Sequence, residues 1–384
     1  MKRFGYFFDK IVSLENINNA DNSARIGKNR SIKYILEHDN NKEFENQFLS
    51  DSLYNLTFKT SKYSCFKIYE PKERIIYKLP YYPDHIYHHA LLNVLKPFWE
   101  KRYIDQTYSC IKGRGIHKCL KDVRKALRDK KNTIYCLQLD IKKFYPNINH
   151  SVLKKIISNK IKERKTLFLI NELIHSVNNI SGYETKGVPI GNWTSQYFGN
   201  IMLSPLDRFC KEKLKCRYYF RYADDIRIFS NNKRYLHNIL GKIKKYLRGL
   251  KLELKSNWSI RNMKREGTDF LGYVIYHNYV MLRKRIKEKM FRSIRKYKNL
   301  NSLYSYQGWL KYASSRNLIR KIKAVSGVFL QNFTSTKRRI KNIYKVFRIE
   351  VRNKYFIYEY CDALGRVYHT KSTSKRLLII MTNK

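Results

Sequence analysis

Apolar and polar residues follow two different periodicities along this chain, and together they predict an α+β fold. A nearly continuous apolar run, TIYCLQLDI at 133–141, predicts a buried strand that ends in a carboxylate. RYYFRYADDIRIFS at 217–230 predicts two short strands around a tight turn with two further carboxylates. Residues 236–252 predict an amphipathic helix instead. Its apolar residues at helical spacing are Leu236, Ile239, Leu240, Ile243 and Leu247.

The segments before residue 133 predict helices and one hairpin. Residues 1–60 are polar and Asn-rich, and they predict a helix pair or one extended helix. The runs YSCFKIYE and RIIYKLP, separated by the turn-prone PKE, predict a hairpin, and residues 84–100 predict a helix. A long helix-rich insert, interrupted at GVPIGNW, separates the two carboxylate-bearing segments.

The last hundred residues are rich in Lys and Arg. We place a boundary near residue 283, after FLGYVIYHNYVML at 270–282. Three helices are predicted beyond it, in RKRIKEKMFRSIRKYKNL, QGWLKYASSRNLIRKI and KRRIKNIYKVFRIEVRNK. The runs YFIYEY and SKRLLII near the end predict a small hairpin.

Composition points to a cored protein with a polyanionic partner. The 384 residues are 43% hydrophobic, enough for two or three packed units. Eighty Lys and Arg against 30 Asp and Glu give a formal charge of +50, which favours nucleic acid as the partner. An anionic membrane would also satisfy this charge. The chain, however, shows no apolar run of about 18 residues and no face-segregated basic helix.

Cysteine and histidine do not predict a metal or disulfide framework. The seven cysteines are an odd number without a CxxC pair, which argues against disulfides and a zinc knuckle and fits a reducing cytoplasm. The N-terminus has no secretory signal pattern. His85, His88 and His89 lie on a predicted helix without an acid cluster, so we expect a structural role and no zinc.

The carboxylates are the candidate chemistry. A strand-end Asp140 followed far downstream by Asp224 and Asp225 would supply the hard oxygens that hold two Mg²⁺ ions, or Mn²⁺, for phosphoryl transfer. Adjacent strand residues point to opposite faces, so Asp224 and Asp225 need not be equal ligands, and we favour Asp224. The alternative is that the pair is a plain turn and Asp140 a helix N-cap.

YADD together with LQLDIKKFYPNI resembles the palm motifs of reverse transcriptases, and the order of motifs is similar from about residue 60 to 315. The resemblance implies an α+β right-hand polymerase, an RNA-directed DNA polymerase that uses dNTPs and grips an RNA–DNA hybrid. It implies an N-terminal extension at 1–60, fingers at 61–132 and a palm at 133–282 with an insert at 150–190. A basic helical thumb at 283–350 and a tail at 351–384 follow.

The same resemblance implies roles for individual residues. Ile141 would give a backbone carbonyl to metal, and Tyr145 would be the steric gate against ribose, with palm core as its alternative. Lys255 would be a proton donor to pyrophosphate or a solvated lysine. The nucleotide would meet Lys72, Arg74, Ile190, Gly191 and Gln196. Template and primer would meet Lys112, Arg114 and the primer-grip residues Phe270, Leu271, Gly272 and Tyr273.

One motif departs from most reverse transcriptases. IGNWTSQ at 190–196 stands where a Gln-Gly pattern is usual, which resembles the enzymes of diversity-generating retroelements that misincorporate opposite template adenine. An apolar Ile190 cannot hydrogen-bond near the nascent pair, although it could equally be wall packing. This family implies a small basic accessory protein oligomer and a structured template RNA. Two alternatives stay open, an antiphage-defence reverse transcriptase with its own noncoding RNA and a non-catalytic RNA-binding protein.

Overall fold

A computed structural model describes residues 3–28, 32–69, 73–177, 180, 184–297, 300–326, 345–352, 355–361 and 367–372. Side chains are described up to residue 322, with a gap at 294–304. The chain divides into two compact units, Met1–Ser326 and Gly327–Lys384, which are taken separately below. Within the described residues, no helix combines the length and apolar content that crossing a membrane requires.

The N-terminal region is helical, as predicted, and holds three helices. They are α1 (Phe8–Val12), α2 (Leu14–Ala24) and α3 (Lys33–Tyr54). The hydroxyl of Ser13 accepts a hydrogen bond from the backbone N–H of Asn16 and so caps α2. Helix α2 packs on the predicted helix α4 (Ile86–Glu100). The extension therefore shares a core with the segment that follows it.

The predicted hairpin is present as β1 (Ser64–Ile68) and β2 (Arg74–Lys78), paired antiparallel. The helices between the hairpin and the carboxylate turn are α5 (Ile116–Ala126), α6 (His150–Ser158), α7 (Arg164–His175) and α8 (Trp193–Arg208). The side chain of Asn149 caps α6 by accepting from Val152 N–H. Helix α8 begins after the GVPIGNW interruption, as the sequence predicts.

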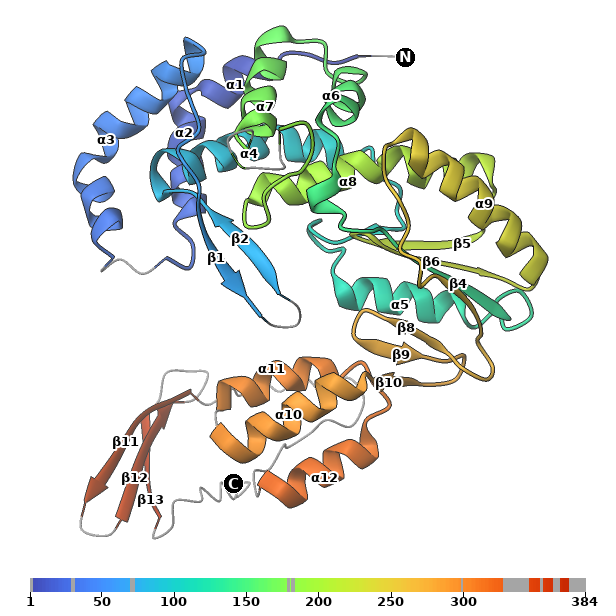
Figure 1. Ribbon diagram of the computed structural model, residues 1–384. Coiled ribbons are helices and arrows are strands. Elements are labelled where there is room, and N and C mark those ends of the chain that lie inside the picture. Colours follow the sequence, from blue (N-terminus) through green and yellow to red (C-terminus); the bar gives the residue numbers. More distant parts are fainter. Residues whose placement is uncertain are drawn as a thin grey trace. The chain divides into compact units, whose positions relative to one another are not determined.

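A five-stranded sheet holds the candidate residues (Figure 1). Its strands are β3 (Thr107–Tyr108), β4 (Tyr135–Asp140), β5 (Tyr218–Tyr222), β6 (Asp225–Ser230) and β7 (Ser259–Asn262). Their order is β3-β5-β6-β4-β7, and all neighbours are antiparallel except β3 and β5. The two predicted carboxylate-bearing segments are therefore adjacent strands at the centre of one sheet.

The two faces of this sheet carry different packing partners, because alternate residues of a strand point to opposite sides. One face belongs to the main core with α8 and α9 (Lys233–Gly249), the predicted amphipathic helix, whose apolar residues are all buried. The strand residues on that face are Leu137, Leu139, Tyr219, Ile226 and Ile228. The opposite face packs on α5, which lies across the sheet from α9 in Figure 1.

In the described residues of the first unit, three short strands and three helices follow. The strands β8 (Thr268–Phe270), β9 (Tyr273–Ile275) and β10 (Val280–Leu282) form an antiparallel sheet. The helices are α10 (Lys284–Tyr297), α11 (Leu300–Leu310) and α12 (Arg316–Ser326). The first two predicted basic helices are confirmed, although QGWLKYASSRNLIRKI is interrupted between α11 and α12.

The second unit corrects two predictions. KRRIKNIYKVFRIEVRNK was expected to be helical, but its residues Lys345–Arg352 form strand β11. YFIYEY was expected to pair with SKRLLII, yet β12 (Tyr355–Cys361) pairs with β11 and with β13 (Val367–Ser372). SKRLLII lies outside the described residues. Alternating apolar and polar positions in VFRIEV explain the strand, since basic composition alone does not set a helical period.

Candidate active site

The three candidate carboxylates meet at one end of the central strand pair. Strands β4 and β6 pair so that Asp140 lies directly opposite Asp225. Asp224 precedes β6 in the two-residue turn that joins it to β5, and Ala223 in this turn has a φ of +53°. A tight turn with a residue in the left-handed region matches the twist of paired strands. The two strands predicted around a tight turn are thus confirmed, and the turn lies at the same end of the sheet as Asp140.

A buried arginine supports this turn from the face that packs on α8. Arg221 is fully buried and pairs with Asp207 of α8, with Nε–Oδ1 and Nη2–Oδ2 distances of 2.7 and 2.6 Å. Its remaining nitrogen donates to Asn200 Oδ1 at 3.0 Å and to the carbonyl of Ala223 at 2.9 Å. Because the bidentate pair fixes the guanidinium, it also fixes the turn carbonyl. Arg221 therefore positions the carboxylate turn.

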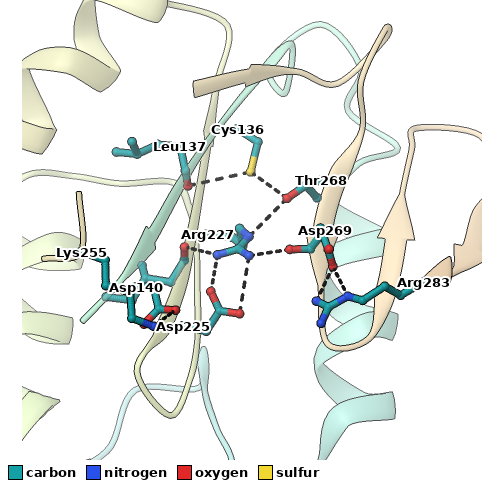
Figure 2. Close-up of polar contacts among 10 residues, drawn as sticks. Cys136, Leu137, Asp140, Asp225, Arg227, Lys255, Thr268, Asp269 and Arg283 are labelled. Atoms are coloured by element: carbon teal, nitrogen blue, oxygen red, sulfur yellow. Dashed lines mark hydrogen bonds and ion pairs between the residues drawn. The ribbon is translucent and has the colours of Figure 1, made fainter. Parts of the chain in front are cut away.

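A second buried arginine holds Asp225 from the opposite face (Figure 2). Arg227 donates through Nη1 and Nη2 to the two carboxylate oxygens of Asp225. It also donates to the carbonyl of Asp269 at 2.5 Å and to Thr268 Oγ1 at 3.2 Å, both in β8. Its guanidinium lies 4.7 Å from the ring centre of Phe270. Arg227 thus links Asp225 to the β8 strand.

These two arginines are functional residues that the sequence analysis missed. Both lie in RYYFRYADDIRIFS, but no role was predicted for either of them. The available signal was a charged residue at a position where the strand pattern requires burial, because buried charges are paired. Asp207, the partner of Arg221, was not visible because it is on a helix. Arg227 pairs with Asp225 in the same motif, but its contact with the backbone carbonyl of Asp269 comes from a different sheet.

Burial and mutual repulsion shift the acidity of the carboxylate pair. Burial raises the pKa of Asp224, and the charge of Asp140 raises it further. Burial also raises the pKa of Asp225 to about 6, although the guanidinium of Arg227 opposes this rise. Neighbouring acids with raised pKa values favour either protons or bound cations. The electrostatics of this site therefore suit a cation.

The donor set fits a divalent metal better than it fits the chain's own cations. Lys255 binds one oxygen of Asp140, with an Nζ–Oδ2 distance of 2.5 Å. The other oxygen, Oδ1, is buried without a hydrogen-bond partner, and the Asp224 carboxylate has no ion pair with a described residue. In the described part of the chain, no group of three or more His, Cys, Asp or Glu side chains is placed so that it could hold a metal ion. Carboxylate oxygens with free lone pairs are nevertheless the ligands that Mg²⁺ prefers.

Other predicted residues surround the acids. Arg74, at the start of β2, is close enough for its charge to lower the pKa of Asp224, as Lys255 does. Burial raises the pKa of Tyr145, and Asp224 adds to this effect, so the ring of Tyr145 lies near the acids. The backbone of Ile141 forms a bridge with Leu254. Lys72 lies outside the described residues.

The segment at 190–196 docks against the β1–β2 hairpin. The carbonyl of Ile190 accepts a hydrogen bond from Tyr77 N–H at 2.8 Å. Gly191 has a φ of +131°, and a Cβ there would lie 2.2 Å from the carbonyl oxygen of Tyr77. Only glycine permits this approach. Ile190 is half-buried, whereas Gln196 is exposed on α8. The structure therefore joins this motif to Arg74 through one hairpin.

The predicted template and primer residues lie in the loop before α5 and in the β8–β9 turn. Arg114 donates to the carbonyl of Ile104 at 2.9 Å, so part of its guanidinium stabilises a local loop, and Lys112 is exposed nearby. FLGY forms the β8–β9 turn, in which Leu271 and Gly272 have φ values of +58° and +82°.

The FLGY turn packs against the helical region that follows it. A Cβ on Gly272 would lie 2.7 Å from the ring of Trp309, and the hydroxyl of Tyr273 donates to the carbonyl of Trp309. Phe270 and Tyr273 are completely buried. These two side chains therefore serve in packing. A contact between FLGY and a primer would have to come from the backbone of the turn.

The three histidines take part in helix packing. His88 is buried and shares a hydrogen bond of 2.8 Å with Thr194 of α8, while His89 lies 4.1 Å from the ring of Trp193. Burial lowers the pKa of His85 and His89 to about 4 and that of His88 to about 3. Neutral rings of this kind pack well between helices α4 and α8.

Comparisons with known proteins agree with this geometry. A sequence-family model described as reverse transcriptase (RNA-dependent DNA polymerase) matches residues 70–275, more than half of the chain. An "Uncharacterized 91 kDa protein in cob intron" from Schizosaccharomyces pombe is 28% identical over 166 residues, covering 42% of this chain and 20% of that protein. The group II intron-encoded protein LtrA from Lactococcus lactis subsp. cremoris is 28% identical over 181 residues, covering 46% and 29%. The chain thus spans less than a third of these relatives' lengths.

Solved structures with a similar arrangement include telomerases. Apo telomerase from Candida tropicalis matches with a TM-score of 0.47 and 13% identity, covering 70% of this chain and 56% of that chain. Telomerase from Candida albicans, in complex with a fragment of telomeric RNA, matches with a TM-score of 0.45 and 13% identity, covering 76% and 59%.

Proposed function

The chain belongs to the reverse transcriptase (RNA-dependent DNA polymerase) family, and we propose that it copies an RNA template into DNA by adding deoxynucleotides to a 3′-hydroxyl. Its fold is the α+β right-hand polymerase fold. We assign fingers to 61–132, the palm to 133–282 and the thumb to helices α10–α12. The thumb proposal no longer includes residues 345–350, because they belong to β11.

The observation that carries this proposal is the convergence of Asp140 and Asp225 as paired residues of β4 and β6, with Asp224 in the adjoining turn. Asp140 and Asp224 would supply most of the protein ligands of two divalent ions. When bound, such ions would activate the primer 3′-hydroxyl and neutralise the charge of the leaving pyrophosphate. The chain itself supplies rigid placement: Arg221 fixes the turn, and Arg227 fixes Asp225. Mg²⁺ is the natural ion for this all-oxygen donor set.

The test is primer extension on poly(rA)/oligo(dT) with Mg²⁺. We expect Asp224→Ala and the isosteric Asp224→Asn to abolish extension while RNA affinity stays nearly unchanged, because each removes a ligand and adds no bulk. Asp51→Asn changes an exposed residue of α3, and this matched control should extend normally. An active Asp224→Asn enzyme would refute the metal assignment. A wild-type chain that binds RNA but never extends a primer would favour the non-catalytic alternative.

The finer proposal is that Ile190 loosens selection at the nascent base pair, as expected for an enzyme of a diversity-generating retroelement. Its backbone carbonyl is already used by Tyr77, and its side chain offers no hydrogen bond. Ile190→Gln should lower the error frequency opposite template adenine, measured by sequencing cDNA made from a defined RNA. Val188→Ile, a buried apolar change two residues away, is the control. An unchanged error spectrum in Ile190→Gln would refute this role and would mean that Ile190 only packs in the wall of the nucleotide site.

The identity of the template RNA distinguishes a diversity-generating enzyme from an antiphage-defence enzyme. A template RNA with a near-duplicate variable gene, and a small basic accessory protein, belongs to the first proposal. A dedicated noncoding RNA belongs to the second. Sequencing the RNA that copurifies with the full chain distinguishes them, because each predicts a different copied sequence.

A further inference from the structure

Strand β8 connects the acid cluster to the helix that follows the small sheet. Figure 2 shows Asp269 of β8 between two arginines, Arg227 of β6 and Arg283. The backbone carbonyl of Asp269 accepts from Arg227 Nη2 at 2.5 Å. Its carboxylate accepts from Arg283 Nε at 2.8 Å and also from Arg283 Nη2. Since Arg227 holds both oxygens of Asp225, one residue of β8 joins the arginine of the acid cluster to a second arginine outside it.

Arg283 is fixed at the start of helix α10, which begins at Lys284. Its backbone N–H donates to the carbonyl of Gly272 at 3.0 Å, in the β8–β9 turn. Its own carbonyl accepts from the N–H of Ile286 at 3.0 Å, in the first turn of α10. Arg283 is thus bonded both to the β8–β9 turn and to the helix. A shift of α10 against this turn therefore moves the guanidinium that holds Asp269.

Side chains make the junction between β8 and the sheet that holds the acids. Strand β8 belongs to the three-stranded sheet, whereas β4 and β6 belong to the five-stranded one. Besides its bond to Asp269, Arg227 donates from Nε to Thr268 Oγ1 at 3.2 Å, and Cys136 of β4 donates to the same oxygen at 3.5 Å. The orientation of Arg227 therefore depends on where β8 lies, because side-chain contacts are less rigid than a shared ladder.

The ion pair between Asp269 and Arg283 affects placement more than folding. Its side chains are 42% and 44% exposed, and water screens such a pair, so it contributes little to the free energy of unfolding. The guanidinium nevertheless donates from two nitrogens, which fixes direction as well as distance in a way that a lysine cannot. A small displacement near an active site can lower a reaction rate strongly. The pair is therefore suited to holding β8 in position.

We propose that Asp269 and Arg283 are positioning residues that couple the placement of α10 to the orientation of Asp225 through Arg227. This inference rests on the proposed polymerase function, in which α10 belongs to the thumb. While α10 packs on the β8–β9 turn, Arg283 holds Asp269, and the carbonyl of Asp269 holds Arg227 against the Asp225 carboxylate. When α10 moves away from this turn, Asp225 loses that support. Because both residues act through Arg227, kcat should respond to them and the KM for dNTP should not.

The test measures primer extension by three single variants of the full chain. Asp269→Ala removes the carboxylate but keeps the backbone carbonyl that Arg227 uses, and Arg283→Gln removes the guanidinium. The matched control is Arg217→Gln, which breaks an exposed ion pair with Asp129, 3.8 Å long, before the start of β5 and away from the carboxylate turn at its end. We expect kcat to fall at least about fivefold in the first two variants and less than about twofold in the control, with KM for dNTP within about twofold in all three.

The signs of the two effects separate coupling from a simple contact with nucleic acid. Charge alone predicts opposite results, because removing an acid strengthens binding to a polyanion and removing an arginine weakens it. Coupling predicts that Asp269→Ala and Arg283→Gln both lower kcat, and that the double variant is no slower than the slower single variant. An Asp269→Ala enzyme with an unchanged or higher kcat would overturn the inference and would leave Arg283 as a contact for nucleic acid only.

A second measurement needs no turnover. In the full chain with isotope-labelled arginine, the NMR resonance of Arg227 Nε–H, assigned by its loss in Arg227→Met, reports the hydrogen bond to Thr268. We expect this resonance to shift in Asp269→Ala and in Arg283→Gln and to stay in place in the Arg217→Gln control. A resonance that neither substitution moves would overturn the coupling. A shift in a chain that never extends a primer would support the coupling while the proposed function failed.

Discussion

Replacing Arg227 with Met should uncouple Asp225 from the β8 strand. The side chain of Arg227 is almost completely buried and makes four kinds of polar contact, to the Asp225 carboxylate, the Ile226 and Asp269 carbonyls and the Thr268 hydroxyl. Methionine has a similar length and no charge, so it leaves little cavity. The substitution therefore removes the hydrogen bonds and the countercharge while keeping most of the packing.

The size of the effect follows from what is left behind. Breaking a buried ion pair by removing one partner costs about 3–5 kcal/mol, because the other charge stays buried. The side chain of Asp225 is 33% exposed, so water screens part of this penalty. We therefore expect a loss of about 2–4 kcal/mol in the free energy of unfolding, against near zero for a fully exposed pair. Asp225→Asn in the same chain removes the orphaned charge and should restore part of that loss.

The assay is urea unfolding of the wild type, the two single variants and the double variant, with primer extension measured on the folded proteins. The double-mutant cycle should give a coupling free energy of about 1–3 kcal/mol between the two residues. Extension by Arg227→Met should fall at least about tenfold without a matching loss of RNA affinity, since Asp225 is no longer held in place. Strictly additive single-variant effects would show that the pair contributes nothing and would refute the reasoning.

Two further predictions concern the hairpin contact and the N-terminal helices. Gly191→Ala should destabilise the protein by about 2–3 kcal/mol in urea unfolding, because the new Cβ would clash with the Tyr77 carbonyl at a residue with a positive φ. The control Gly241→Ala, which has open space around it on α9, should not destabilise the protein. Equal effects of the two substitutions would contradict the clash. Burial lowers the pKa of His38, but the neighbouring carboxylates of Asp21 and Glu45 outweigh this effect and raise the pKa. The stability that protonated His38 contributes is fully present below its unfolded-state pKa of about 6.5 and is lost as pH rises through its folded-state pKa. The difference in urea midpoint between wild type and His38→Gln should therefore be larger at pH 6 than at pH 9. A difference that does not change with pH would contradict this prediction.

Local patterns predicted the carboxylate strands and the helix at 236–252 well, because their periodicity reports burial directly. Strand β4 ends at Asp140, and every predicted apolar position of α9 is buried. The meeting of Asp140 with Asp225 was inferred from the two-metal chemistry that such carboxylates serve and from the resemblance, and not from periodicity. Strand register depends on contacts between segments about 85 residues apart, which no local pattern contains.

Non-local partners also explain what the sequence could not give. Arg221 and Arg227 are charged residues at positions that the strand pattern would bury, but the Asp207 carboxylate and the Asp269 backbone carbonyl that they contact lie on other elements. The same holds for a basic pocket of about 590 Å³ next to β4, because its lining residues Asn149, Lys186 and Arg248 come from segments separated by about 40 and 60 residues. The strand at β11 was missed for a different reason. Its alternation was present, but Lys and Arg content outweighed it.

The distribution of countercharge around the three acids ranks them as metal ligands. Arg227 occupies both oxygens of Asp225, and Lys255 occupies one oxygen of Asp140 while the other stays buried without a partner. Asp224 receives no ion pair from a described residue, although its burial and the charge of Asp140 both penalise its ionised form. A buried carboxylate left uncompensated by its own chain needs a cation from outside. We therefore propose that Asp140 and Asp224 would be the ligands of a divalent ion, and that Asp225, which Arg227 holds in place, would be a structural anchor.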